Sequence, residues 1–241
     1  MKTVAVIQAR MNSTRLPGKV LLPIGDTNAI QMIVNKCKAN KLIDEVVVAT
    51  PFTSNSIIAY CYANNIIVWT GDEENVLNRV YQTAKAFKAD IIVDITSDCP
   101  FIDLDDLHRY LGPIQSNSMD YVSNILTRSF PDGLDLQIYS FKALERLSKL
   151  VILPEHYQHT GWNFSTYLSE FKLLNIHASK PLHFPELRIT LDTAEDYAVL
   201  NLIYAWLGAD AKPLEIVNFM RNNPKIMAIN QNVIAKTPGE L

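Results

Sequence analysis

The chain has 241 residues, of which 48% are hydrophobic, and its formal net charge at pH 7 is -3. That length and apolar content predict one main domain with a substantial buried core. A slightly acidic chain lacks the broad basic surface that replaces the counterions of nucleic-acid phosphates, which excludes a general nucleic-acid binder.

Cysteine usage and the amino-terminal sequence indicate a cellular location. The three cysteines, Cys37, Cys61 and Cys99, form neither a C-x-x-C metal pair nor a disulfide framework, so a reducing, cytoplasmic environment is expected. Met1 is followed almost at once by an apolar run only a few residues long, which is too short for a signal peptide. No stretch of about 18 apolar residues is present, so no membrane association is expected.

The first element is the run Val4-Ala5-Val6-Ile7, which predicts a fully buried strand. Ligands in open α/β sheets collect just beyond the carboxyl ends of such strands, and the segment 8–19, with the sequence QARMNSTRLPGK, begins there. It contains cations and hydroxyls close to a Pro-Gly turn: Arg10, Ser13, Thr14, Arg15 and Lys19. This combination predicts a site for a polyanion, most naturally a triphosphate, and the alternative is a solvated surface loop.

The same loop does not match two common phosphate-binding motifs. Lys19 is followed by Val20 instead of the Ser or Thr of a Walker A motif, and the upstream glycine of that motif is missing. No G-x-G-x-x-G dinucleotide fingerprint occurs in the chain. Phosphate binding is therefore expected to depend on side chains more than on a glycine-rich backbone.

Strands and helices then alternate up to about residue 110. Further strands are predicted at 45–50, 66–69 and 90–95, and helices at 29–37, 56–63 and 76–84. Asp26-Thr27 and Asp72 are the predicted caps of the first and third helices. Several strands are continuously apolar, which is typical of a parallel sheet covered on both faces.

The pattern changes from Asp120 onward. Residues 134–139 alternate between apolar and polar, which predicts an antiparallel strand and hence a mixed sheet, followed by a helix over 141–150. Residues 154–185 contain four of the five histidines and several aromatic residues, a composition typical of an insertion or interface. A strand at 187–191 is expected to return to the main sheet, before a helix over 193–207 and a shorter one that starts at 213 and stops before Pro224.

Two aspartates follow predicted strands that are far apart in the sequence. Asp98 comes just after the strand 90–95, and Asp192 comes just after the strand 187–191. Carboxylates that meet at one sheet edge suit a Mg²⁺ ion that bridges to phosphates. The alternatives are that Asp98 is only a turn residue before Pro100, and that Asp192 is a helix cap with Glu195 three positions later.

These motifs together resemble a known family. Residues 7–19, IQARMNSTRLPGK, resemble the opening signature of the cytidylyltransferases that activate sugar acids such as acylneuraminate and KDO, and are most similar to the branch of spore-coat polysaccharide biosynthesis protein F. Residues 96–100, TSDCP, and 190–196, TLDTAED, resemble that family's T-G-D-C-P and T-V-D-T-P-E-D elements, with Ser97 and Ala194 in place of Gly and Pro.

The resemblance implies a fold of the nucleotide-diphospho-sugar transferase type. This is an α/β, Rossmann-like, mixed but mostly parallel sheet flanked by helices, with a small acceptor and dimerisation insertion. A single nucleotidyltransferase domain is expected over 1–241. It would consist of a nucleotide-binding half at 1–118, an acceptor and dimerisation region at 119–186, and a return to the main sheet with C-terminal helices at 187–241.

The resemblance also implies roles for individual residues at the nucleotide. The expected nucleotide ligands are Ala9, Arg10, Ser13, Thr14, Arg15, Lys19, Asn75, Thr96 and Asp98. The expected catalytic residues are Arg10, Arg15, Lys19, Asp98 and Asp192, of which Asp98 and Asp192 would hold Mg²⁺. For Asn75 the alternative is a solvated side chain on a helix surface.

The acceptor side rests on two further similarities. P-D-G-L-D at 131–135 and the pair Glu155-His156 resemble elements of this branch, and the expected acceptor-binding residues are Asn124, Asp132, Gly133, Asp135, Glu155, His156 and Arg188. Considered alone, the sequence of residues 131–133 predicts only a turn. The segment 155–159 does not match H-E-x-x-H, so zinc is not expected. No general base stands out, which favours a phosphorylated acceptor because a phosphate is already a nucleophile.

The sequence therefore predicts a Mg²⁺-dependent cytidylyltransferase that transfers CMP from CTP to a small acidic or phosphorylated acceptor and releases pyrophosphate, for surface polysaccharide or capsule modification. The branch implies sugar acids, sugar phosphates or phosphoglutamine as acceptors, with phosphoglutamine the leading candidate, and a homodimer. Two alternatives remain open. One is a glycosyltransferase of related fold, for which Asp103-Leu104-Asp105 is formally a D-x-D motif, and the other is a non-catalytic nucleotide-binding homologue.

Overall fold

A single mixed sheet forms the centre of the molecule. The computed structural model describes residues 1–153 and 156–234, and seven strands in that part pair in the order β3-β2-β1-β4-β6-β5-β7. The strands are β1 Thr3–Gln8, β2 Glu45–Pro51, β3 Ile67–Gly71, β4 Ile91–Thr96, β5 Tyr121–Ser123, β6 Gln137–Ser140 and β7 Leu173–Asn175. Within this sheet β6 runs antiparallel to its neighbours β4 and β5, and the other pairs are parallel. The predicted mixed, mostly parallel sheet is confirmed.

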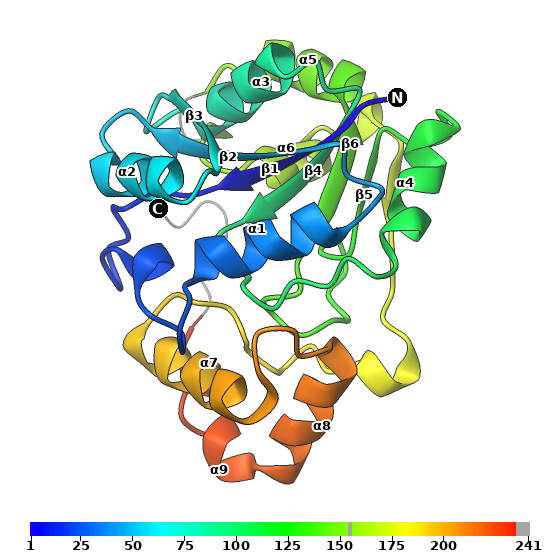
Figure 1. Cartoon of the computed structure of the whole chain (residues 1–241). Coiled ribbons are helices and arrows are strands. Elements are labelled where there is room, and N and C mark those ends of the chain that lie inside the picture. Colours follow the sequence, from blue (N-terminus) through cyan, green and yellow to red (C-terminus); the bar gives the residue numbers. More distant parts are fainter. Residues whose placement is uncertain (154–155, 235–241) are drawn as a thin grey trace.

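Helices cover both faces of this sheet (Figure 1). They are α1 Ala29–Ala39, α2 Asn55–Ala63, α3 Val76–Ala86, α4 Leu107–Gln115, α5 Phe141–Leu150, α6 Thr160–Thr166, α7 Ala194–Leu207, α8 Pro213–Asn222 and α9 Pro224–Met227, with 3₁₀ turns η1 Lys19–Leu21, η3 Leu168–Glu170 and η4 Lys180–Leu182. Apolar residues of α1, α2 and α4 pack on one face, and those of α3, α5 and α6 on the other. Alternate strand residues face these two layers, so β1, β2 and β4 are almost fully buried.

The predicted caps of two helices are wrong by a few residues. Asn28 caps α1 by accepting a hydrogen bond from the backbone N–H of Gln31, and Asn75 caps α3 in the same way. Asp72 instead accepts hydrogen bonds from the backbone N–H groups of Glu74 and Asn75, which shapes the turn before α3. Both helices thus begin after an Asn that the apolar spacing alone did not single out.

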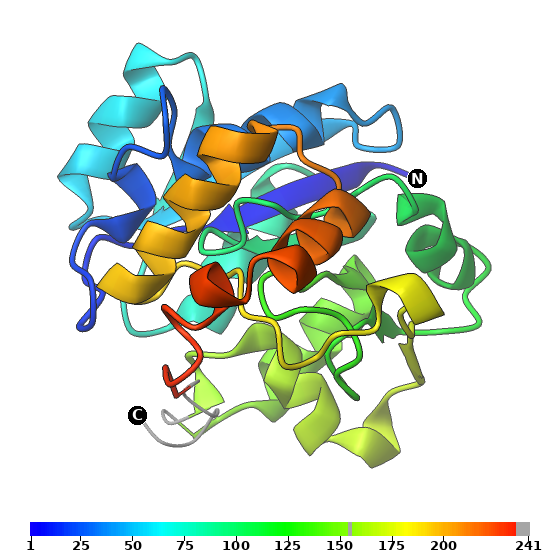
Figure 2. The ribbon, with the colours of Figure 1, turned by 90° about the horizontal axis from the view of Figure 1, so that it is seen from below.

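The predicted return of 187–191 to the main sheet is also wrong. Within the described residues this segment forms only one isolated bridge, between Arg188 and Asp132, and no strand of the seven-stranded sheet lies beyond Asn175. Leu187, Ile189 and Leu191 are buried against apolar residues of α7 and α8. The apolar side chains of this segment therefore pack against helices instead of entering the sheet. Figure 2 shows α7 to α9, in gold to red, gathered next to this segment.

The three cysteines are buried and free. Among the helices of residues 1–153 and 156–234, none has the length and apolar character needed to cross a bilayer.

A buried carboxyl group lies in the centre of the sheet on β4. Asp94 is 1% exposed, and its two oxygens accept hydrogen bonds from Nε2 of Gln8 at 2.5 Å and from the hydroxyl of Tyr139 at 2.7 Å. Burial raises the pKa of Asp94 to about 6, although the two hydrogen bonds act in the opposite direction. The folded protein therefore holds a proton at Asp94 at a pH where the unfolded chain has lost it.

Asp94→Asn tests this linkage. Because the folded-state pKa is raised, the carboxyl group favours folding at low pH, and this contribution is lost as the pH rises from about 4 through 6. The stability of the variant relative to the wild type is expected to increase by about 1 to 3 kcal/mol between pH 4 and pH 7. Urea unfolding of both proteins at several pH values measures this difference, and a difference independent of pH would contradict the assignment.

Candidate active site

A cavity of about 610 Å³ opens beyond the carboxyl ends of β1 and β4. The sheet, α3, α6 and the segments around residues 132 and 190 surround it. Many residues expected from the sequence line this cavity together: Ala9, Arg10, Ser13, Thr14, Arg15, Lys19, Thr96, Asp98, Asp132, Asp135, Arg188 and Asp192. The basic loop and the two remote aspartates thus meet at one edge of the sheet.

Lys19 lies between the two aspartates. Its ammonium Nζ is 2.8 Å from Oδ1 of Asp192 and 3.3 Å from Oδ2 of Asp98, and Lys19 is only 8% exposed. Burial acts to lower the pKa of Lys19, but the charges of the two carboxylates outweigh it and raise the pKa. The two carboxylates therefore face a single point, which a cation already occupies.

Asp192 is the most heavily paired acid of the site. Besides Lys19, it contacts Nη2 of Arg15 at 3.0 Å and Nη2 of Arg188 at 2.8 Å. Burial acts to raise the pKa of Asp192, yet these cations lower it to about 2. The carboxylate is thus ionised throughout the physiological pH range.

Backbone contacts hold the two aspartate segments together. The carbonyl oxygen of Asp98 accepts hydrogen bonds from the backbone N–H of Leu191 at 2.8 Å and from the hydroxyl of Thr190 at 3.1 Å. The helix that follows is capped by Thr193, which forms a capping box with Asp196. The alternative that Asp192 is the cap is therefore wrong, and its carboxylate faces the cavity instead.

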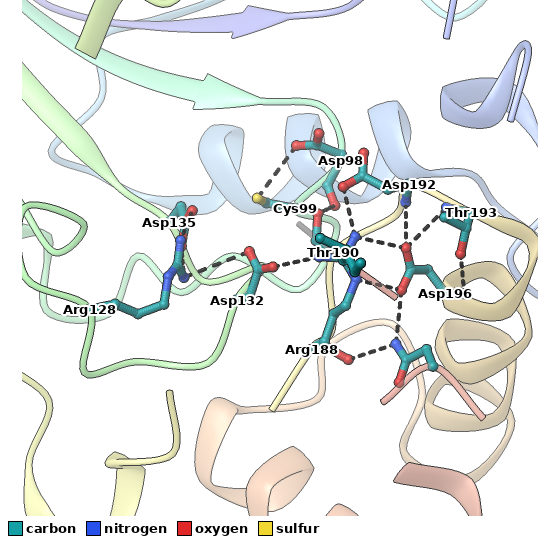
Figure 3. Close-up of polar contacts among 12 residues, drawn as sticks. Asp98, Cys99, Arg128, Asp132, Asp135, Arg188, Thr190, Asp192, Thr193 and Asp196 are labelled. Atoms are coloured by element: carbon teal, nitrogen blue, oxygen red, sulfur yellow. Dashed lines mark hydrogen bonds and ion pairs between the residues drawn. The ribbon is translucent and has the colours of Figure 1, made fainter. Parts of the chain in front are cut away.

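Arg188 lies at the centre of a buried ionic network (Figure 3). Its guanidinium contacts Asp196 through Nε at 2.8 Å, Asp132 through Nη1 at 2.7 Å and Asp192 through Nη2. Asp196 is fully buried and also accepts a hydrogen bond from the side-chain amide of Asn230. Each nitrogen of the guanidinium thus has a carboxylate partner, so the network fixes the position of Asp192.

Asp132 lies between two arginines, as Figure 3 shows. Its carboxylate contacts Arg188 and, at 3.7 Å, Nη1 of Arg128. The two Nη atoms of Arg128 also donate to the two carboxylate oxygens of Asp135, at 2.8 and 2.9 Å. Burial, followed by the charge of Asp135, raises the pKa of Asp132 to about 6. The arginines on this wall of the cavity are therefore matched by acids.

Four expected site residues do not line the cavity. The amide oxygen of Asn75 caps α3, and the amide of buried Asn124 bonds to the backbone of Leu134 and Leu136. Gly133 has a φ of 110°, and a Cβ there would meet the backbone of residues 189 and 190 at 2.6 Å, so it shapes the turn. The ring of His156 packs edge-on against Trp162. Glu155, the other expected acceptor residue, lies outside the described residues.

The site residues expected from the sequence do not include several residues that line the cavity. Arg79, Arg128, Gln158, His159 and Trp162 line the same space. A signal was present for Arg79, because it lies among the apolar positions of α3 and is therefore a charged group on a buried helix face. The others come from loops or a short helix, where no periodic pattern indicates which way a side chain points.

The donor set at Asp98 and Asp192 fits a hard divalent cation. Two carboxylates face one point, whereas no cluster of three or more His, Cys, Asp or Glu suited to a metal occurs in residues 1–153 and 156–234. A metal here would take its other ligands from nucleotide phosphates and water, as Mg²⁺ does when it binds through one or two carboxylates.

The formal D-x-D motif is elsewhere. Asp103 and Asp105 line a second cavity of about 430 Å³ together with Lys36 and Lys212, and Asp105 is paired with Lys212 at 2.7 Å. Neither residue lines the cavity that contains the basic loop. The motif therefore lies apart from the site that the glycosyltransferase alternative would require.

Comparison with known proteins gives consistent matches. The cytidylyltransferase family model matches residues 4–156. The spore coat polysaccharide biosynthesis protein SpsF of Bacillus subtilis is 28% identical over 91% of this chain and 94% of its own length. A solved cytidylyltransferase from Leptospira borgpetersenii has a TM-score of 0.88 and 29% identity, and the match covers 98% of this chain and 100% of that one.

A more distant structure shares the fold alone. The CMP:2-keto-3-deoxy-manno-octonic acid synthetase complexed with CTP has a TM-score of 0.64 at 17% identity, over 86% of this chain and 99% of that one. The family model spans more than half of the present chain, and the match to the Leptospira borgpetersenii cytidylyltransferase covers almost all of it, which supports a CTP-dependent nucleotidyltransferase. The chain therefore belongs to the cytidylyltransferase family.

Proposed function

We propose that the protein is a Mg²⁺-dependent enzyme that transfers CMP from CTP to a small acidic or phosphorylated acceptor, releasing pyrophosphate, in surface polysaccharide or capsule modification. The observation that carries this proposal is the convergence of Asp98 and Asp192 on Lys19, beside the loop of Arg10 and Arg15. Cations for a triphosphate and carboxylates for a metal are the two requirements for joining two anionic reactants.

Each group has a distinct task in this proposal. Bound Mg²⁺, held by Asp98 and Asp192, would neutralise phosphate charge and orient the α-phosphorus. Lys19 and Arg15 would leave their carboxylate partners for the triphosphate and stabilise the departing pyrophosphate. Arg188 stays paired with buried Asp196 and acts as a positioning residue for Asp192. Arg10, Ser13, Thr14, Ala9 and Thr96 complete the proposed nucleotide side.

The acceptor is proposed to bind along the remaining walls of the cavity, near Asp132 and Asp135. The name of the Bacillus subtilis relative supports a role in polysaccharide biosynthesis, and the name of the CTP-bound synthetase supports a sugar acid as one acceptor class. Sugar phosphates and phosphoglutamine are the other classes, with phosphoglutamine the leading specific candidate. A homodimer is part of the same proposal and rests on the family resemblance.

A pyrophosphate-release screen tests the proposed reaction. The four nucleoside triphosphates are each combined with a sugar acid, a sugar phosphate and phosphoglutamine in the presence of Mg²⁺. The expected result is release with CTP and one acceptor class, and no release without metal. Sugar transfer from a nucleotide sugar would instead support a glycosyltransferase, and CTP binding without any release would support a non-catalytic homologue.

Lys19→Met separates metal binding from turnover. Because the Lys19 ammonium occupies the point that both carboxylates face, its removal is expected to strengthen Mn²⁺ binding to the nucleotide-free protein at least about tenfold, while turnover with CTP falls. Electron paramagnetic resonance of Mn²⁺ measures the affinity. Arg109→Met, an exposed arginine on α4, is the control, and weaker Mn²⁺ binding in Lys19→Met would contradict the proposed metal position.

A further inference from the structure

A second group of nitrogen-bearing side chains lines the wall of the cavity formed by α3 and α6. Arg79 comes from α3, Arg10 follows β1, and His159 directly precedes α6. Arg79 is only 2% exposed, and its aliphatic part fits against Gly71, where a Cβ would meet Cγ of Arg79 at 2.9 Å. The fold therefore makes room for a guanidinium on the buried face of a helix.

These two arginines lack the acidic partners that the other cavity arginines have. Arg79 donates through Nη1 to the backbone carbonyls of Asp72 and Glu73, and Arg10 donates through Nη1 to the side chain of Gln158 at 3.2 Å. Among residues 1–153 and 156–234, no carboxylate lies within 4.0 Å of either guanidinium, whereas Arg15, Arg128 and Arg188 each have at least one.

Two buried side-chain nitrogen atoms that lack a hydrogen-bond partner within the described residues belong to the same group of residues. Nε of Arg79 is buried without a hydrogen-bond partner in the described part of the chain, and so is Nε2 of His159. Burial, followed by the charge of Arg10, lowers the pKa of His159, so its ring is neutral near pH 7 and can present one N–H. A buried guanidinium donor without a partner is costly unless a ligand satisfies it.

We propose that Arg79 and His159, which lie next to Arg10 of the proposed nucleotide side, form a subsite that binds an anionic group of the acceptor, a phosphate or a carboxylate. This proposal rests on the proposed transferase function, and the subsite would determine which acceptors the enzyme selects. It adjoins Trp162 of α6, which offers aromatic surface to the carbon skeleton of a ligand. An uncharged acceptor would leave the buried guanidinium of Arg79 without an anionic partner and is therefore selected against.

Anion binding to a non-reacting complex tests the subsite. The protein is saturated with Mg²⁺ and α,β-methylene CTP, which fills the nucleotide side without transferring CMP, and inorganic phosphate or acetate is then titrated by calorimetry. Arg79→Met is expected to weaken binding of the preferred anion at least about tenfold and to change the affinity for the CTP analogue less than twofold. Arg79→Lys is expected to restore part of the loss, and Arg109→Met to bind as the wild type does.

The outcomes separate this proposal from the function on which it rests. Unchanged anion binding in Arg79→Met, or wild-type protein that binds neither anion, overturns the subsite. An equal loss of affinity for the CTP analogue in Arg79→Met would assign Arg79 to the nucleotide side, and this result also overturns the subsite. If the wild type does not bind the analogue, the proposed function fails, and titration of the free protein with phosphate still tests the subsite. Should Arg79→Met fail to fold, His159→Gln is measured in its place, with the same expected loss of anion binding.

Discussion

Asp98→Asn is expected to reduce the rate of CMP transfer by a factor on the order of 10² to 10³ and to leave the stability almost unchanged. The substitution removes one of the two carboxylates that face the proposed metal. The Asp98 side chain is 28% exposed and its contact with Lys19 is 3.3 Å long, whereas the closer contact of Lys19 with Asp192 at 2.8 Å is retained. Activity should therefore fall without a comparable loss of folding free energy.

Pyrophosphate release at increasing Mg²⁺ concentrations, together with urea unfolding, measures both effects for Asp98→Asn. The matched control is Asp105→Asn, because Asp105 is an exposed aspartate paired with Lys212 outside this cavity. The control is expected to retain turnover. Wild-type turnover and wild-type Mg²⁺ dependence in Asp98→Asn would remove Asp98 from the mechanism.

Arg188→Met is expected to produce the largest loss of stability, about 3 to 5 kcal/mol in the free energy of unfolding. Arg188 is 8% exposed and is the cationic partner of Asp196, which is fully buried. Without the guanidinium, Asp196 keeps only its contacts with N–H donors, from Asn230 and from the backbone near Thr193. A buried carboxylate that loses its cation carries the full desolvation penalty.

Arg128→Met is the matched control for this loss. Its guanidinium also pairs with two aspartates, but its side chain is 36% exposed, so water can replace the lost partner. A change of at most about 1 kcal/mol is expected for this more exposed pair. Equal losses in the two variants, measured by urea unfolding at pH 7, would show that burial does not set the strength of the Arg188 network.

The sheet and the basic loop were predictable because their signals are local. Continuous apolar runs such as Val4 to Ile7 identify buried parallel strands, and the loop follows the first of them directly. The juxtaposition of residues 98 and 192 followed from family resemblance together with their positions after apolar segments. The structure brings their carboxylates to a common contact with Lys19.

Tertiary contacts decided what the sequence did not reveal. The apolar alternation at 187–191 is the same for a strand and for an extended segment packed against helices, so periodicity could not separate the two. The buried ionic partners of Arg188 come from positions 132, 192 and 196, which no local pattern connects. The expected roles of Asn75 and Asn124 compete with hydrogen bonds to the backbone that the sequence alone does not display.

A titration of Mn²⁺ into the complex with α,β-methylene CTP, followed by electron paramagnetic resonance, tests the metal-and-nucleotide site most directly. For the wild type we expect one tightly bound ion per chain with hyperfine coupling to nucleotide phosphorus. The double variant Asp98→Asn/Asp192→Asn should lose at least about a hundredfold in affinity for that ion, about 2.7 kcal/mol. Wild-type affinity and coupling in the double variant would mean that these two carboxylates do not hold the metal.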